Sequence, residues 1–164
     1  MAHEPEARMT SAEPISAAYI ARRGVSQQWR GFLRAMVETL DEHLDSAGRS
    51  ALLRAIGARM AADLPLAYCD TLAELEARIN DTLAGAEWGF CRLSVDLPAA
   101  LLVIAHGAAP AVSTSEDADG AWAGAVLEGL YGTWLAGQPG ADASLAPKIV
   151  AWTPGEAVLH YAKG

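Results

Sequence analysis

The feature that most constrains the fold of this chain is a stretch rich in both glycine and tryptophan, GAWAGAVLEGLYGTWLAGQPGA, at residues 120–141. Its apolar residues recur at steps of three and four, which is the period of an α-helix. A glycine inside a helix costs about 1 kcal/mol relative to alanine, so several internal glycines indicate close approach by another backbone or ring. We interpret the stretch as a packing element, within one chain or between copies, and assign that role to Trp122, Gly124, Gly129, Leu130, Gly132 and Trp134.

Two amphipathic helices are predicted before this stretch. The first begins after Ser26, which suits an N-cap, and ends at Gly48, and its acidic residues, Asp45 included, are interpreted as a solvated face. The second covers residues 50–63, and its Gly57 is expected to pack closely against the first helix. The helical period predicts that the inward-facing side chains are Trp29, Phe32, Leu33, Met36, Val37, Leu40, Leu44, Leu52, Leu53, Ile56 and Met60.

A third helix and two hairpins are predicted around the central stretch. The helix begins with a capping box formed by Thr71 and Glu74 and stops at Gly85. Apolar and polar residues alternate over residues 88–106, which predicts a β-hairpin, and the segment 148–162 predicts a second one.

The glycine-rich helix itself is predicted at residues 121–136, after a loop at 107–119 in which Asp119 caps the helix. The order of these elements predicts an α+β fold with N-terminal helices, an antiparallel sheet made of two hairpins, and a glycine-rich central helix.

Length and composition bound the organisation of the chain. At 164 residues it suits one domain, which we place at 26–164, after a flexible N-terminal segment at 1–25. Within that segment, residues 15–20 are expected to form a loose helical turn that docks on a neighbouring molecule. The net charge of −8 argues against nucleic acid and anionic membranes as main partners. The hydrophobic share of 52% indicates a large core or a surface buried between subunits.

The sequence contains no pattern typical of a targeting or membrane-spanning segment. Glu4 and Glu6 interrupt the first residues and no apolar core follows them, unlike in a secretory signal peptide. The longest weakly polar run, residues 97–112, is shorter than the ~20 residues that a transmembrane helix needs. We therefore expect a cytoplasmic protein.

A search for reactive groups predicts no catalytic residue, no metal site and no cofactor. Cys69 and Cys91 are interpreted as reduced, mostly buried thiols. His106 is interpreted as a hydrogen-bonded histidine at a strand end, because no other metal ligand lies at a suitable spacing. Glu128, the one carboxylate of the central helix, is interpreted as a polar-face residue or as a hydrogen-bond acceptor at an interface.

Three blocks of the sequence resemble one known family. WAGAVLEGLYGTWLAGQPGA resembles the signature of the bacterial cellulose synthase operon protein D family. FLRAMVETLDEHLDSAGRSALLRAIGARMA, at residues 32–61, resembles the first two helices of that family, and EWGFCRLSVDL resembles its first strand. The blocks occur in the family's order and cover roughly residues 32–141.

The resemblance implies a non-catalytic accessory subunit of bacterial cellulose synthesis. Members of the family form a cylinder-like octamer built from dimers, with passages in which nascent glucan chains are thought to lie, and they work beside the other cellulose synthase subunits. The family has been described both as periplasmic and as an intracellular scaffold. Its N-terminal segment faces the passages, and the counterparts here that are expected to hydrogen-bond sugar hydroxyls are Arg22, Arg23, Gln27 and Gln28.

Two other interpretations belong to different classes. One is a small-ligand-binding α+β domain in which Cys91 and the hairpins line an apolar pocket. The other is an enzyme such as a glucan hydrolase, which would need two convergent carboxylates about 5–10 Å apart in a cleft.

Overall fold

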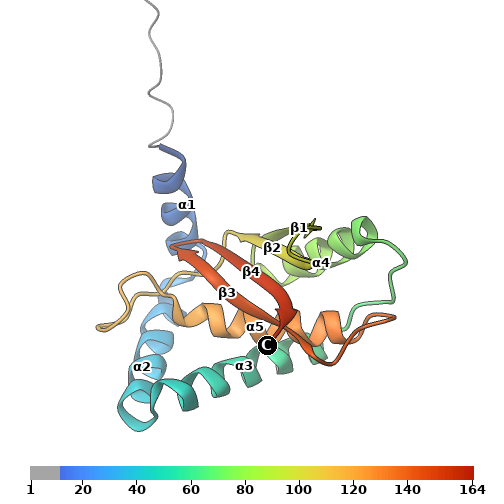
Figure 1. The fold of residues 1–164 in the computed structure, drawn as a ribbon. Helices are drawn as coiled ribbons and strands as arrows, with labels where there is room; N and C mark the ends of the chain where they lie inside the picture. Colours follow the sequence, from blue (N-terminus) through green and yellow to red (C-terminus); the bar gives the residue numbers. More distant parts are fainter. Residues whose placement is uncertain (1–11) are drawn as a thin grey trace, which may run out of the picture.

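The computed structural model describes residues 12–164, in which five helices accompany a four-stranded antiparallel sheet (Figure 1). The α+β fold predicted from the sequence is thereby confirmed. None of the helices in this described part is long and apolar enough to cross a membrane. The elements in chain order are α1 Ala12–Arg23, α2 Gln27–His43, α3 Ser46–Asp63, α4 Leu72–Ala86, β1 Phe90–Asp96, β2 Leu101–Gly107, α5 Trp122–Ala136, β3 Leu145–Thr153 and β4 Glu156–Lys163.

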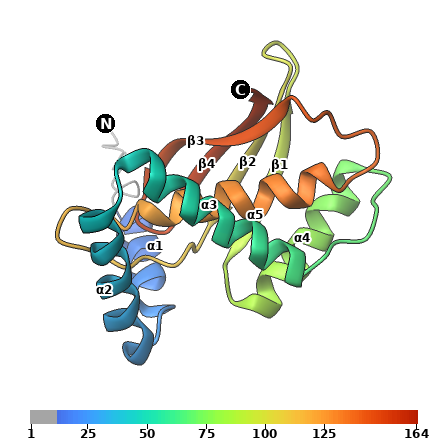
Figure 2. The ribbon, with the colours of Figure 1, turned by 90° about the horizontal axis from the view of Figure 1, so that it is seen from below.

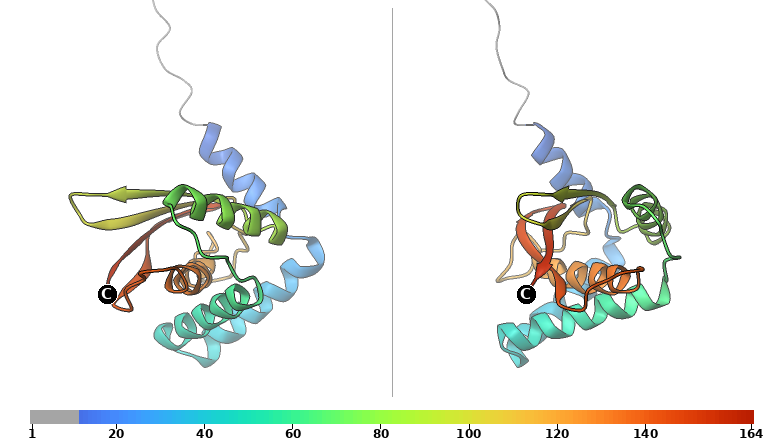
Figure 3. Two further views of the ribbon diagram at one scale, coloured as in Figure 1. Left: turned by 90° about the vertical axis from the view of Figure 1, so that its right-hand side faces the viewer. Right: turned by 45° about the vertical axis from the view of Figure 1, so that its right-hand side comes forward.

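The sheet is made of the two predicted hairpins, joined so that the strand order is β1-β2-β4-β3. Leu93, Ile104 and Leu159 lie in register on three neighbouring strands and are all buried, so they mark the face that meets the helices. The β1–β2 hairpin extends beyond the rest of the sheet (Figure 3). Strand β3 begins at Leu145, before the predicted start, and includes Pro147, which an edge strand tolerates because its outer N–H groups need no ladder partner.

Helix α5 is the centre of the molecule, with the sheet on one side and α3 on the other (Figure 2). Two groups of buried side chains meet on it. The larger one fills the space between α4, α5 and the sheet, and its fully buried members include Ile79, Leu83, Ile104, Leu127, Leu130, Tyr131 and Leu159. The smaller one joins α2, α3, the loop before α5 and the start of α5, and consists of Val37, Leu53, Val112, Trp122, Ala123 and Val126.

Glycines allow α3 and α5 to cross at backbone distance. A methyl group added to Gly57 of α3 would overlap the carbonyl oxygen of Val126 and lie 2.8 Å from the amide nitrogen of Leu130. A methyl group on Gly129 of α5 would in turn overlap the carbonyl group of Arg54. The prediction that Gly57 packs against the first helix is therefore wrong, because its partner is the central helix.

The first two predicted helices also differ in their boundary. Helix α2 ends at His43, and α3 begins at Ser46 rather than at Ser50. The reason is Asp45, whose carboxylate accepts a hydrogen bond of 2.7 Å from the amide of Gly48 and caps α3. Asp45 is thus a capping residue rather than part of a solvated face, and Gly48 lies inside the first turn of α3.

The predicted inward face of these helices is only partly covered. Val37 and Leu53 are buried, but α2 makes few contacts with α3, and α3 turns mainly its Leu53, Gly57 and Ala61 side toward α5. Side chains beside that narrow strip face away from the core. The residues predicted to be inward but found exposed are Trp29, Phe32, Leu44, Leu52 and Ile56.

The ends of the chain elements bring three smaller differences. Glu87 takes the left-handed conformation that ends α4, so the helix continues past Gly85. Asp117, and not Asp119, accepts a hydrogen bond from the first amide of α5, that of Trp122. Helix α1 covers Ala12–Arg23 where the sequence predicts only a loose turn, and the part of the predicted flexible segment before it, residues 1–11, lies outside the described residues.

Candidate functional site

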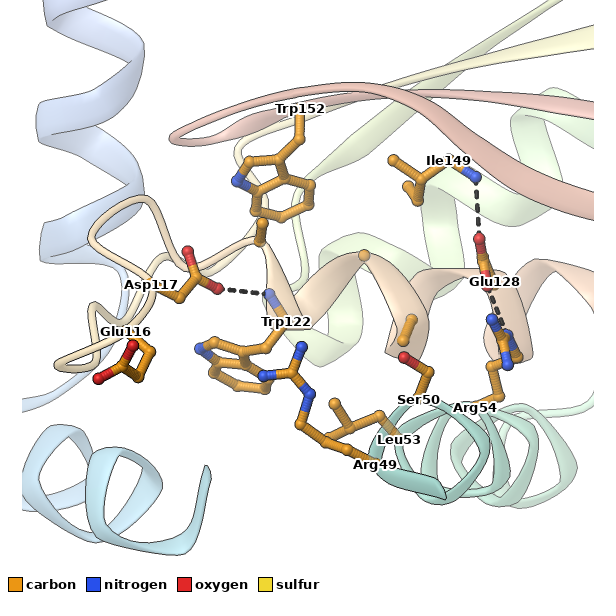
Figure 4. A pocket seen from close by; sticks show the side chains of 13 residues that line it. Arg49, Ser50, Leu53, Arg54, Glu116, Asp117, Trp122, Glu128, Ile149 and Trp152 are labelled. Atoms are coloured by element: carbon orange, nitrogen blue, oxygen red, sulfur yellow. Dashed lines mark hydrogen bonds and ion pairs between the residues drawn. The ribbon is translucent and has the colours of Figure 1, made fainter. Parts of the chain in front are cut away.

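A cleft of about 460 Å³ opens where α3, the start of α5, the loop before α5 and strand β3 meet (Figure 4). Its lining combines charged side chains with two indole rings. The cations come from α3, the carboxylates from the loop and from α5, and the indoles from α5 and β3. The side chains that give the cleft its character are Arg49, Arg54, Glu116, Asp117, Glu128, Trp122 and Trp152.

Glu128 is the buried charge at the base of the cleft, with 9% of its surface exposed. One carboxylate oxygen pairs with Nε of Arg54 on α3 at 2.5 Å, and the other accepts a hydrogen bond of 2.9 Å from the amide of Ile149 on β3. The side chain therefore ties three elements together inside one chain. It is neither on a polar face nor at a subunit interface, so the sequence-based interpretation of Glu128 is wrong in its location, although it is a hydrogen-bond acceptor.

The two indoles are held by hydrogen bonds to the loop before α5. Trp122 donates from Nε1 to the carbonyl of Val112 at 2.8 Å, and Trp152 donates from Nε1 to the carbonyl of Asp119 at 3.1 Å. Trp122 is 7% exposed, whereas Trp152 is half-buried and overlies the start of α5 (Figure 4). The loop is fixed in this way from both of its sides.

The carboxylates of the cleft do not form a glycosidase pair. Both oxygens of Glu128 accept hydrogen bonds from N–H groups, which favours the ionised form and leaves no proton to donate. Asp117 likewise accepts from the amide of Trp122 at 2.9 Å. A glycosidase requires one carboxyl group that can hold a proton beside the scissile bond. The geometry of the cleft therefore gives no support to the glucan hydrolase interpretation. Among the described residues, no cluster of three histidine, cysteine or acidic side chains is arranged to hold a metal ion.

A second group of titratable side chains is buried between α5 and the sheet. Nδ1 of His106 lies 2.6 Å from the hydroxyl of Tyr131, and Cys91 is buried beside them. Burial lowers the pKa of His106 to about 4 and raises the pKa of Cys91 to about 11. Burial also raises the pKa of Tyr131. All three groups are therefore neutral at pH 7, and the thiol of Cys91 is protonated and unreactive.

This buried group decides two sequence-based interpretations. His106 is a hydrogen-bonded histidine at the end of β2, as predicted, and both cysteines are free thiols. Cys91 is packed in the core, and Cys69 is half-buried. Cys91 does not line the cleft described above, so the cleft gives no support to a ligand pocket built around that thiol.

The residues expected to contact glucan come together at the junction of α1 and α2. Arg22, Arg23, Gln27 and Gln28 are all exposed there. The guanidinium of Arg23 donates to the hydroxyl of Tyr19 at 3.0 Å and lies 5.6 Å from the centre of its ring. Sequence reasoning missed the aromatic character of this surface, because it placed two of its rings in the core. The exposed apolar side chains of this α1–α2 surface are Tyr19, Ile20, Trp29 and Phe32.

Comparison with known proteins places the chain in a family. The family model that describes the D subunit of cellulose synthase matches residues 15–162, nearly the whole chain. The chain belongs to this cellulose synthase family. Cellulose synthase operon protein D of Komagataeibacter xylinus is 34% identical over 110 residues, which are 67% of this chain and 70% of the relative. The protein of the same name from Komagataeibacter sucrofermentans has the same identity and coverage. The resemblance inferred from the sequence motifs is confirmed.

The glycine-rich block that resembles the family signature packs mainly against the chain itself. A methyl group on Gly124 would lie 3.0 Å from Cγ1 of Ile149, and one on Gly132 would lie 3.4 Å from Cδ of Pro147. Trp134 donates from Nε1 to the carbonyl of Leu64 at 2.9 Å, and Leu130 is 1% exposed. The block therefore brings α3 and β3 onto the two sides of α5.

Proposed function

We propose that this protein is a non-catalytic accessory subunit of bacterial cellulose synthesis. It assembles with copies of itself into a ring or cylinder of eight chains built from dimers, and works beside the other cellulose synthase subunits on the cytoplasmic side of the membrane. The assembly guides nascent β-1,4-glucan chains and promotes their crystallisation into ordered fibres. The observation that carries this proposal is the match to the family of the cellulose synthase D subunit over residues 15–162.

Assembly is supported by the apolar surface that one chain leaves open. Single exposed apolar residues are normal on a monomer, but grouped ones are typical of interaction surfaces. On the α1–α2 surface Trp29 and Phe32 expose 55% and 57% of their surface, and Tyr19 and Ile20 expose 59% and 57%. A closed ring of subunits covers such surfaces and accounts for a hydrophobic share of 52% in a chain of this size.

Glucan contact is supported by the polar residues beside those rings. Arginine and glutamine side chains supply several N–H donors, which suit the hydroxyl groups of a sugar chain. Arg22, Arg23, Gln27 and Gln28 expose such groups to solvent at the end of α1 and the start of α2. We assign the contact with glucan to these four residues.

Binding of soluble glucan fragments by the purified protein tests this assignment. Cellohexaose is titrated into the protein and compared with maltohexaose, which carries the same sugar with a different linkage. We expect the variant with alanine at Arg22, Arg23, Gln27 and Gln28 to bind cellohexaose on the order of tenfold more weakly, equivalent to about 1.4 kcal/mol. The control variant carries alanine at Arg59 and Arg78, two exposed arginines of α3 and α4, and is expected to bind like the wild type. Equal binding by all three proteins would remove the assignment.

A further inference from the structure

Helix α2 carries an exposed pair of aromatic rings in its N-terminal half. The rings of Trp29 and Phe32 meet edge to face, with 5.6 Å between their centres and an angle of 84° between their planes. More than half of each side chain is exposed, although this arrangement is usual for rings inside a core or an interface. The two rings therefore form a preassembled apolar projection on the surface of the helix.

The same helix carries a shallow groove in its C-terminal half. Its volume is about 350 Å³, and it is lined by Phe32, Ala35, Met36, Thr39 and Leu40. These residues follow the spacing of one helix face, with Phe32 at the boundary between the projection and the groove. Met36 and Leu40 are half-buried and supply apolar atoms to the floor.

A projection and a groove on one helix face are complementary to each other in a second copy. We propose that this face of α2 pairs with the same face of another chain across a two-fold axis, with the two helices antiparallel. Phe32 of each chain then enters the groove of the other, so that both grooves are filled at once. Such mutual filling is what a two-fold interface requires. The inference rests on the proposed function, in which the assembly is built from dimers, and adds the surface that forms the dimer.

The charges at the two ends of this face favour the antiparallel arrangement. Exposed Arg22 and Arg23 lie at the end of α1, just before α2 begins, and exposed Glu42 lies in the last turn of α2. Antiparallel pairing brings the basic end of each copy toward the acidic end of the other, whereas parallel pairing would bring like charges together. Exposed ion pairs contribute little affinity, but they select one orientation over another.

Two substitutions test the projection and the groove separately. Phe32→Ser removes the inserted ring, and Thr39→Arg places a large charged side chain in the groove. Both positions are exposed in the single chain, so the variants are expected to keep its circular dichroism spectrum. Leu97→Ser is the matched control, because Leu97 is 80% exposed in the turn between β1 and β2, away from α2.

The readout is the mass of the assembly, measured by light scattering at equal protein concentrations. We expect both α2 variants to fall to half the wild-type mass or less and the Leu97→Ser control to keep it. A wild-type mass in either folded α2 variant overturns the proposed interface while leaving the assembly itself intact. Variants that keep the mass but lose cellohexaose binding would make this face a glucan surface and also overturn it. A wild-type protein with the mass of one chain would contradict the proposed function as well.

Discussion

The crossing of α3 over α5 leads to a specific prediction for Gly57→Ala. The added methyl group would overlap the carbonyl oxygen of Val126 and lie 2.8 Å from the amide nitrogen of Leu130. Both are main-chain atoms of α5, so neither can rotate away and α3 must shift outward. Overpacking of a core costs about 1–3 kcal/mol, and contact with a backbone puts this site at the upper end. The better helix propensity of alanine returns about 1 kcal/mol. We expect a net loss of about 2 kcal/mol in the free energy of unfolding.

Thermal unfolding followed by circular dichroism measures this loss. For a domain of 150–250 residues, 1 kcal/mol corresponds to about 2–4 °C, so the midpoint should fall by about 4–8 °C. All samples are compared at one protein concentration, because assembly makes the midpoint concentration-dependent. Gly31→Ala in α2 is the control, since its methyl group would meet no atom within 4 Å, and it should be as stable as the wild type or up to about 1 kcal/mol more stable. A Gly57→Ala protein as stable as the wild type would refute the close crossing.

Three further predictions follow from buried groups. Because the pKa of His106 falls from 6.5 to about 4 on folding, its contribution to stability is complete above pH 6.5 and is lost as the pH falls toward 4, by about 3 kcal/mol in total. Urea unfolding between pH 7 and 4 should show this slope, and His106→Asn should show a shallower one. Glu128→Ala leaves Arg54 and the amide of Ile149 without their acceptor, and we expect it to lower the free energy of unfolding by about 3 kcal/mol in urea titrations, against less than about 0.5 kcal/mol for the exposed Asp63→Ala. Cys91 should resist a thiol reagent in the folded protein and react only after unfolding, while Cys69 reacts first; equal rates would contradict the buried position of Cys91.

Local signals explain which parts of the fold are predictable from the sequence. The amide of Glu74 donates to the hydroxyl of Thr71 at 3.1 Å, as the capping box predicts, because a cap depends only on residues a few positions apart. The two hairpins are predictable for the same reason. The buried stripe of α5 is predictable because α5 is covered on opposite sides, so almost any apolar residue on it is buried.

Features that depend on distant partners were not predictable. The period of α2 identifies its apolar face but not the element that covers it, and within one chain nothing covers Trp29 or Phe32. Glu128 and Arg54 are 74 positions apart, so no local pattern indicates their ion pair. Gly57 signals close packing by its lack of a side chain, yet its partner helix becomes known only from the structure.

The candidate site follows the same division. The sequence places Arg22, Arg23, Gln27 and Gln28 on the surface before and at the start of the first long helix, and the structure finds them exposed there. The neighbouring aromatic rings that complete this surface were assigned to the core, because helical periodicity cannot distinguish a face that meets the same chain from one that meets another chain. A sequence stripe wider than its intramolecular partner is the signal that pointed to an interface.

The central claim is that the protein organises cellulose and does not make it. It is tested most directly by deleting its gene in the cellulose-producing host and measuring the crystallinity of the secreted fibres by X-ray diffraction. The account predicts less ordered cellulose in the deletion strain, restoration by the wild-type gene, and incomplete restoration by the Phe32→Ser gene at equal protein level. Normal yield and normal crystallinity in the deletion strain would contradict it.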